Sequence, residues 1–142
     1  MKHLSIVFIF TCISFVTFAQ TKQKRLTDKH INIVGTPIYI IAPPSFVNAR
    51  IFPGLSDTIS DATIVVKKNN NSTIDLNKAK SRKQFGTTVL YFKKLINNKE
   101  YHFLEIQLNP SEYYLIESSF QESNSNIISE NIQKALSTVI VL

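Results

Sequence analysis

Three runs rich in tyrosine, phenylalanine, isoleucine and leucine follow one another in the second half of the chain. They span residues 87–95, 101–108 and 112–118, and the segments 97–99 (NNK) and 109–111 (NPS) separate them. Runs of this length and composition are typical of β-strands, and asparagine, proline and serine are turn-forming residues. Short turns of this kind join antiparallel strands. The sequence therefore predicts an antiparallel meander, and this meander limits the fold more than any other feature.

The middle run alternates in a way that separates a core face from an outer face. The predicted core face carries His102, Leu104, Ile106 and Leu108, and the opposite face carries Tyr101, Phe103, Glu105 and Gln107. His102 is thus expected to be a packed or edge histidine and not a catalyst.

The end of the chain predicts an amphipathic helix that lies across the sheet. Its apolar residues recur at helical spacing, namely Ile128, Ile132, Ala135, Leu136 and Val139. Asn126 is a suitable N-cap. Residues 139–142 are expected to end the chain as a short strand.

The first half of the chain has weaker patterns. Residues 31–34, 37–42 and 62–66 predict short strands, and an irregular stretch is expected from Ser45 onward. The basic segment 72–84 is expected to hold a short helix around residues 76–83.

The N-terminus predicts export. A basic start precedes an apolar run over residues 4–18, and the small residues Thr17 and Ala19 fit a signal-peptidase site. The run is short for a membrane anchor, and the bulky residues before Cys12 do not fit a lipoprotein site. We therefore expect a periplasmic or secreted protein that lacks a transmembrane span after cleavage. Because Cys12 is the only cysteine, the mature chain has no disulfide.

These features divide the chain into three parts. Residues 1–19 form the signal peptide, residues 20–34 a basic N-terminal arm with a first short strand, and residues 35–142 a single α+β domain. The expected fold is a twisted antiparallel sheet, built on the meander and covered by the C-terminal amphipathic helix.

Charge is distributed unevenly. Residues 20–99 hold fourteen lysines and arginines against four aspartates, whereas residues 100–142 hold one lysine against six glutamates. One interpretation is a basic face for an anionic partner. The other is that the two halves interleave in one sheet and neutralise each other.

Motifs for several kinds of chemistry are missing. The mature chain offers His30 and His102 as its only histidines, which does not suit a zinc site, and it has no G-x-S-x-G elbow or phosphate-binding glycine loop. We expect no metal, no cofactor, no catalytic residue and no nucleic-acid partner. The basic residues fit an anionic cell-surface polymer or lipid headgroup better.

One proline-rich segment is the candidate binding surface. Rigid prolines and nearby aromatic residues suit docking, and the candidates are Pro43, Pro44, Phe46, Arg50 and Phe52. The alternative is that the two phenylalanines plug one end of the sheet.

A resemblance supports the same fold. Residues 35–46 (GTPIYIIAPPSF) followed by 52–55 (FPGL), and the later 136–139 (LSTV), resemble short exported bacterial proteins that are similar to the PsbP-like α/β sandwich. This resemblance implies a twisted antiparallel sheet covered by helices, in a fold known more for docking than for catalysis. The expected function is a non-enzymatic binding module that engages a protein or envelope component. A small periplasmic hydrolase built around His102 and an inhibitor or immunity-type protein are the alternatives.

Overall fold

The computed structural model describes residues 26–121 and 125–142. The predicted signal peptide and the first residues of the predicted arm lie outside these described residues. Within them the chain is α+β, with antiparallel sheets and one C-terminal helix, as the sequence predicts.

The larger sheet has seven strands in the order β3-β4-β5-β9-β8-β7-β6, and all neighbours are antiparallel. Its strands are β3 (Phe46–Asn48), β4 (Gly54–Asp57), β5 (Thr63–Asn69), β6 (Lys80–Gln84), β7 (Thr87–Ile96), β8 (Lys99–Asn109) and β9 (Glu112–Gln121). The predicted meander is confirmed as β7-β8-β9. Two strands begin where predicted, and the other ends extend by one to three residues, because the strands continue to pair up to their turns.

The smaller sheet has three strands in the order β1-β2-β10, and it joins the beginning of the domain to its end. These strands are β1 (Ile31–Asn32), β2 (Ile38–Ile40) and β10 (Ile140–Val141). The predicted short C-terminal strand is confirmed. His30 strengthens this junction, since its Nε2 lies 3.1 Å from the Thr138 carbonyl oxygen.

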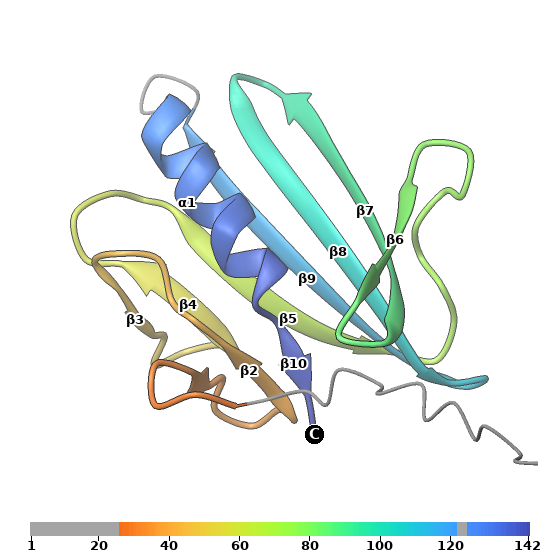
Figure 1. Ribbon diagram of the computed structural model, residues 1–142. Coiled ribbons are helices and arrows are strands. Elements are labelled where there is room, and N and C mark those ends of the chain that lie inside the picture. The colour runs from red at the N-terminus through yellow and green to blue at the C-terminus, as the bar shows by residue number, and fades with distance from the viewer. Residues whose placement is uncertain (1–25, 122–124) are drawn as a thin grey trace, which may run out of the picture.

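The helix α1 (Ser125–Ser137) begins one residue before the predicted N-cap and packs on β9 and β8. Figure 1 shows it lying along one face of the large sheet, while β7 and β6 extend beyond it on one side. Its apolar side chains Ile132 and Leu136 are fully buried against the sheet. Burying side chains of this size contributes about 1.5 to 3 kcal/mol each, so the predicted amphipathic face holds the helix in place.

The predicted core face of β8 is correct for three of its four residues. His102, Leu104 and Ile106 are buried, but Leu108 is 39% exposed because it lies at the end of the strand, beside the bulge between Gln107 and Asn109. Glu105 is buried on the opposite face. Its carboxylate accepts hydrogen bonds from Ser72 and from the Thr73 amide and hydroxyl, so the loop after β5 covers it.

Two predictions for the first half are wrong. The helix expected around residues 76–83 is instead a turn followed by β6, which pairs with β7 over its whole length. The stretch expected to be irregular contains β3 and β4, which form a hairpin. In both places the backbone gains its hydrogen bonds from a neighbouring strand. Local composition does not reveal such pairing in short or polar strands.

Strand pairing neutralises part of the uneven charge. Lys67 and Lys68 on β5 each lie 2.7 Å from a carboxylate of β9, Glu117 and Glu112 respectively. These pairs join the basic half to the acidic half, as the interleaving interpretation predicts. The basic residues of β6 are not part of these pairs, and they define the region considered next.

Candidate functional site

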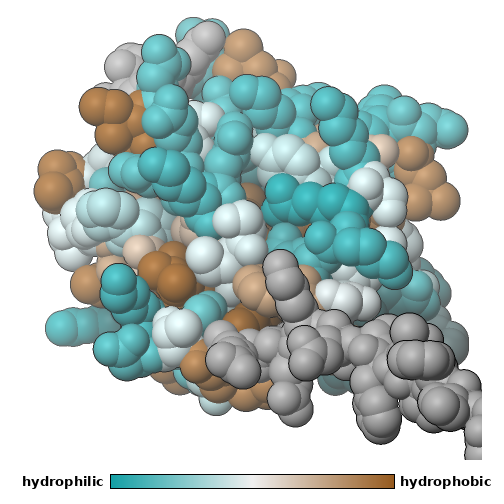
Figure 2. Space-filling model, viewed as in Figure 1, coloured by the Kyte–Doolittle hydropathy of each residue, from teal (hydrophilic) through white to brown (hydrophobic). Residues whose placement is uncertain are grey.

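A groove runs between α1 and the β6–β7 edge of the large sheet, on the side where these strands extend beyond the helix. Two hollows mark it: one of about 300 Å³ lies between the two strands and Gln133, and one of about 460 Å³ lies at the turn between the strands, beside Ser137. We call this region the helix-edge groove. The residues that line it include Lys78, Lys80, Arg82, Lys83, Gln84, Tyr91, Lys93, Gln133 and Ser137. In the same view as Figure 1, hydrophilic residues predominate over the part of the surface where β7 and β6 lie (Figure 2).

The arrangement of the groove follows from the two periodicities of its walls. Lys80, Arg82 and Gln84 alternate along β6, so they share one face at intervals of about 7 Å. Gln133 and Ser137 are four residues apart on α1 and therefore lie on one side of the helix. The result is a row of cationic and amide groups along one wall of the groove, which also has apolar lining from Phe85 and Phe92.

Arg82 is the unusual residue in this groove. Its guanidinium lies 5.2 Å from the centre of the Tyr91 ring, and its Nε and Nη2 atoms are buried without a hydrogen-bond partner among the described residues. Buried polar atoms in folded proteins almost always have a partner, and an unpaired one costs about 1 to 3 kcal/mol. Arg82 also lines a hollow, so its cationic guanidinium is suited to bind an acceptor there.

Gln84 fixes the end of the groove nearest the small sheet. Its Nε2 donates to the Leu136 and Val139 carbonyl oxygens, at distances of 2.8 and 3.1 Å. These two hydrogen bonds tie β6 to the end of α1. Its Oε1 is buried and has no partner among the described residues.

A chain of hydrogen bonds lies beneath the other end of the groove. The Tyr91 hydroxyl is 2.8 Å from His102 Nδ1, and His102 Nε2 is 2.6 Å from Glu100 Oε1. Ser129 of α1 donates to the same Glu100 oxygen at 2.7 Å. This network links β7, β8 and α1, and the imidazole at its centre is fully buried.

The protonation states in this network follow from its partners. Burial opposes the ionisation of Glu100, but hydrogen bonds from Ser129 and His102 outweigh this effect and hold its pKa below the ordinary value. Burial lowers the pKa of His102, although its bond to Glu100 offsets part of that change. The neutral imidazole therefore carries its proton on Nε2, facing an acceptor-only carboxylate, and Nδ1 accepts from Tyr91. Burial also raises the pKa of Tyr91, so its hydroxyl keeps its proton.

The hydrolase alternative required a serine and a carboxylate beside His102, and the structure brings Ser129 and Glu100 there. The geometry does not match a catalytic triad, in which the acid and the nucleophile contact opposite ring nitrogens. Both groups lie at Nε2, with Ser129 Oγ 3.4 Å away and donating to Glu100 instead. The buried ring also lacks exposure to a substrate. This cluster is best explained as the polar network that positions Tyr91 and α1.

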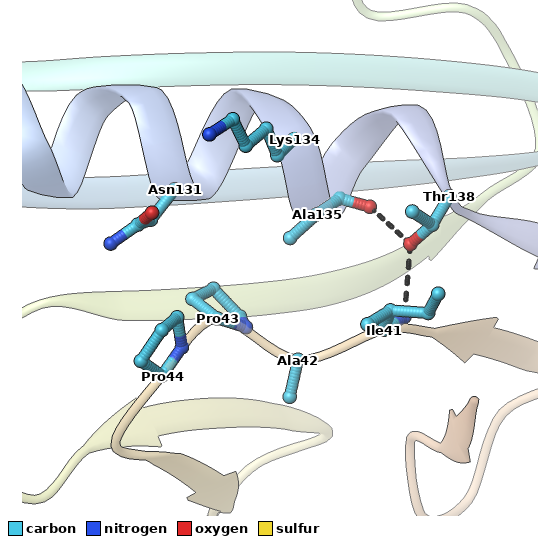
Figure 3. A pocket seen from close by; sticks show the side chains of 8 residues that line it. All are labelled: Ile41, Ala42, Pro43, Pro44, Asn131, Lys134, Ala135 and Thr138. Carbon is cyan, nitrogen blue, oxygen red and sulfur yellow. Dashed lines mark hydrogen bonds between the residues drawn. The ribbon is translucent and has the colours of Figure 1, made fainter. Parts of the chain in front are cut away.

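The residues predicted for docking lie elsewhere. Pro43 and Pro44 line a hollow of about 200 Å³ beside α1 (Figure 3), where Thr138 Oγ1 accepts from the Ile41 amide at 2.9 Å. Phe46 is a core residue, so its side chain cannot belong to an exposed surface. This burial agrees with the alternative for Phe46, in which the side chain packs in the sheet.

Arg50 is exposed, and Phe52 is partly buried with its ring close to Gly54. Their role in binding stays a prediction, as does that of the two prolines.

The residues that form the helix-edge groove were only partly foreseen. The lysines and Arg82 stand out in the sequence as basic segments, but the pairing that aligns them was hidden by the expected helix. A period-two pattern of long polar side chains at positions 80, 82 and 84 is the signal that identifies such a strand.

No family model and no curated protein matches the chain. Among residues 26–121 and 125–142, no group of three or more histidine, cysteine or acidic side chains could hold a metal ion. The described part of the chain also contains no helix with the length and apolar character needed to cross a membrane.

Proposed function

We propose that this protein is an exported, non-enzymatic binding module of the bacterial cell envelope, and that the helix-edge groove binds an anionic ligand. The observation that carries this proposal is Arg82, a cation that lines an open hollow and whose Nε and Nη2 atoms have no hydrogen-bond partner among the described residues.

An anion fits the groove chemically. Sulfate, phosphate and carboxylate groups are acceptors that match the planar donors of a guanidinium. The lysines at 78, 80 and 93 line the same region, and two of them have a carboxylate nearby: Lys78 lies 3.6 Å from Asp75, and Lys93 lies 3.7 Å from Glu100. The excess of positive charge attracts anions from a distance, and the hollows admit them.

The shape of the groove favours a linear polyanion over a single small ion. Lys80 and Arg82 repeat along β6 at about 7 Å, so an extended chain with regularly placed anionic groups could contact both. An acidic polymer at the cell surface has this chemistry and fits an exported protein.

Export and fold are part of the proposal. Export is supported by the signal-like N-terminus, and the mass of the purified native protein should correspond to a chain that starts at Gln20. A full-length mass would contradict export. We further propose that the domain is a PsbP-like α/β sandwich, which an antiparallel sheet with a covering C-terminal helix supports. The fold by itself does not determine the function.

Binding to fluorescent dextran sulfate, with uncharged dextran as the control polymer, tests the anion site. The protein should bind the sulfated polymer, and binding should weaken steeply with added salt because counterions are displaced. Lys80→Gln should reduce affinity about threefold to tenfold, since it removes one cation from the groove wall.

Lys94→Gln is the matched control. Lys94 neighbours Lys93 on β7 but points to the opposite face of the sheet, so the change in net charge is the same while the groove stays intact. Equal losses for Lys80→Gln and Lys94→Gln would indicate general electrostatic attraction and would overturn the assignment of the groove.

A further inference from the structure

The hydroxyl of Tyr91 has one proton, and this proton is already engaged in a hydrogen bond within the protein. His102 Nε2 must donate to Glu100, so Nδ1 is an acceptor and the phenol donates to it over 2.8 Å. Tyr91 also lines the hollow at the lysine-rich end of the helix-edge groove. Toward a ligand, this hydroxyl can therefore act only as a hydrogen-bond acceptor.

This arrangement conflicts with an anionic ligand. A sulfate or phosphate oxygen accepts hydrogen bonds, and two acceptors facing each other repel. Tyr91 could turn its proton toward the ligand, but His102 Nδ1 would then be left without a donor in a fully buried ring. Buried acceptors without a partner are costly, so the neutral imidazole resists this change.

A second proton on the imidazole removes the conflict. We propose that binding of an anion beside Tyr91 is coupled to uptake of one proton by His102, so that the affinity of the groove for anions rises as the pH falls. This inference rests on the proposed function, and it adds a form of regulation to the same site.

The proton balance is simple. One proton passes from solvent to Nδ1, which then donates a hydrogen bond to the Tyr91 oxygen, and the phenol keeps its own proton and donates a hydrogen bond to the anion. Glu100 remains a carboxylate and stabilises the imidazolium through the existing contact at Nε2. No covalent bond is made or broken.

The groups around His102 allow this change. Tyr91 and Lys93 face it from β7, and Glu100 faces it from its own strand. The flanking β9 contributes Ser118, opposite in the register, and Phe120, whose ring centre is 5.8 Å away. The helix α1 contributes Ser129, whose Oγ lies near His102 Nε2. Glu100 is thus the one carboxylate in contact with His102, and Lys93 is the one opposing cation among these groups.

The sign of the effect follows from linkage. Burial lowers the pKa of His102 in the free protein, so the imidazole is neutral near pH 7, and the bound anion stabilises the protonated form. Above the pKa of the free protein, affinity should fall with increasing pH, by at most tenfold per pH unit for one proton. Below that pKa, affinity should become independent of pH.

Dextran sulfate is a suitable probe because its sulfate groups keep their charge over the whole range. Its affinity for the wild-type protein should fall at least threefold between pH 5.5 and 7.5. Tyr91→Phe removes the coupling hydroxyl and leaves the arginine and lysines in place. This variant should still bind, with a pH dependence reduced to that of a general charge effect.

His30→Gln is the matched control, since it removes the other histidine of the described residues, at the junction with Thr138. It should keep the full pH dependence. A wild-type protein that fails to bind at any pH would overturn the proposed function. A wild-type protein that binds without pH dependence, or a Tyr91→Phe variant with an unchanged pH slope, would overturn only the proton coupling. Circular dichroism establishes that each variant is folded.

Discussion

Replacing Arg82 with methionine should make the protein more stable and at the same time weaken its binding to dextran sulfate. The stability gain comes from removing Nε and Nη2, which are buried and have no partner in the part of the chain that the structure describes, from a groove that already holds several lysines. Methionine can keep a contact with the Tyr91 ring through its flexible thioether. We expect the free energy of unfolding to rise by about 1 kcal/mol, or about 3 to 5 °C in melting temperature.

The binding loss has the same origin. Hydrogen bonds to charged groups contribute about 1.5 to 3 kcal/mol, so losing those from Arg82 should reduce affinity tenfold or more. Opposite changes in stability and binding are expected where a residue is retained for function at a cost to the fold. Thermal unfolding and fluorescence titration of the same preparations measure both effects. A variant that is less stable than the wild type would show that Arg82 has a structural role.

Replacing Gly54 with alanine should destabilise the domain severely. A Cβ atom at this position would lie 2.1 Å from the Ile64 carbonyl oxygen and 2.9 Å from the Phe52 ring. The Ile64 carbonyl oxygen belongs to the backbone of β5, the strand that pairs with β4. The clash can therefore be relieved only if the two strands move apart. We expect a loss of about 3 kcal/mol or more, a large part of the stability of a domain of this size.

Urea unfolding of Gly54→Ala beside Gly86→Ala checks this prediction. Gly86 has a positive φ of 80° in the turn between β6 and β7, but a Cβ there would meet no atom within 4 Å. Its replacement should cost only the strain of a left-handed residue, about 1 to 2 kcal/mol. Equal losses at the two glycines would mean that β4 and β5 do not approach so closely.

The sequence predicted the parts of the fold in which each element carries its own pattern. The meander β7-β8-β9 has aromatic and branched residues between clear turns, and α1 has apolar residues at helical spacing. β6 lacks such a pattern, because Lys80, Arg82 and Gln84 face a groove instead of a core. The burial of Glu105 was also hidden, since its partners Ser72 and Thr73 are more than thirty residues away along the chain.

The site was less predictable because its residues also lack a local pattern and have partners that are distant in the sequence. The basic residues were recognised as a possible surface for an anionic polymer, but a row of charges needs a known strand direction before its geometry can be described. The network around His102 depends on the register between β7 and β8 and on the position of α1 on the sheet, which the sequence pattern did not specify. Phe46, in contrast, was assigned to a surface because an aromatic residue beside prolines can suit either docking or packing.

The most direct test of the anion site is a titration of the ¹⁵N-labelled protein with a short sulfated dextran oligosaccharide, followed by two-dimensional NMR. The groove predicts that amide signals of residues 80–84, 91–93 and 129–137 shift together and saturate at one ligand concentration. Shifts confined to residues 43–53, or small shifts spread over all exposed lysines, would contradict it.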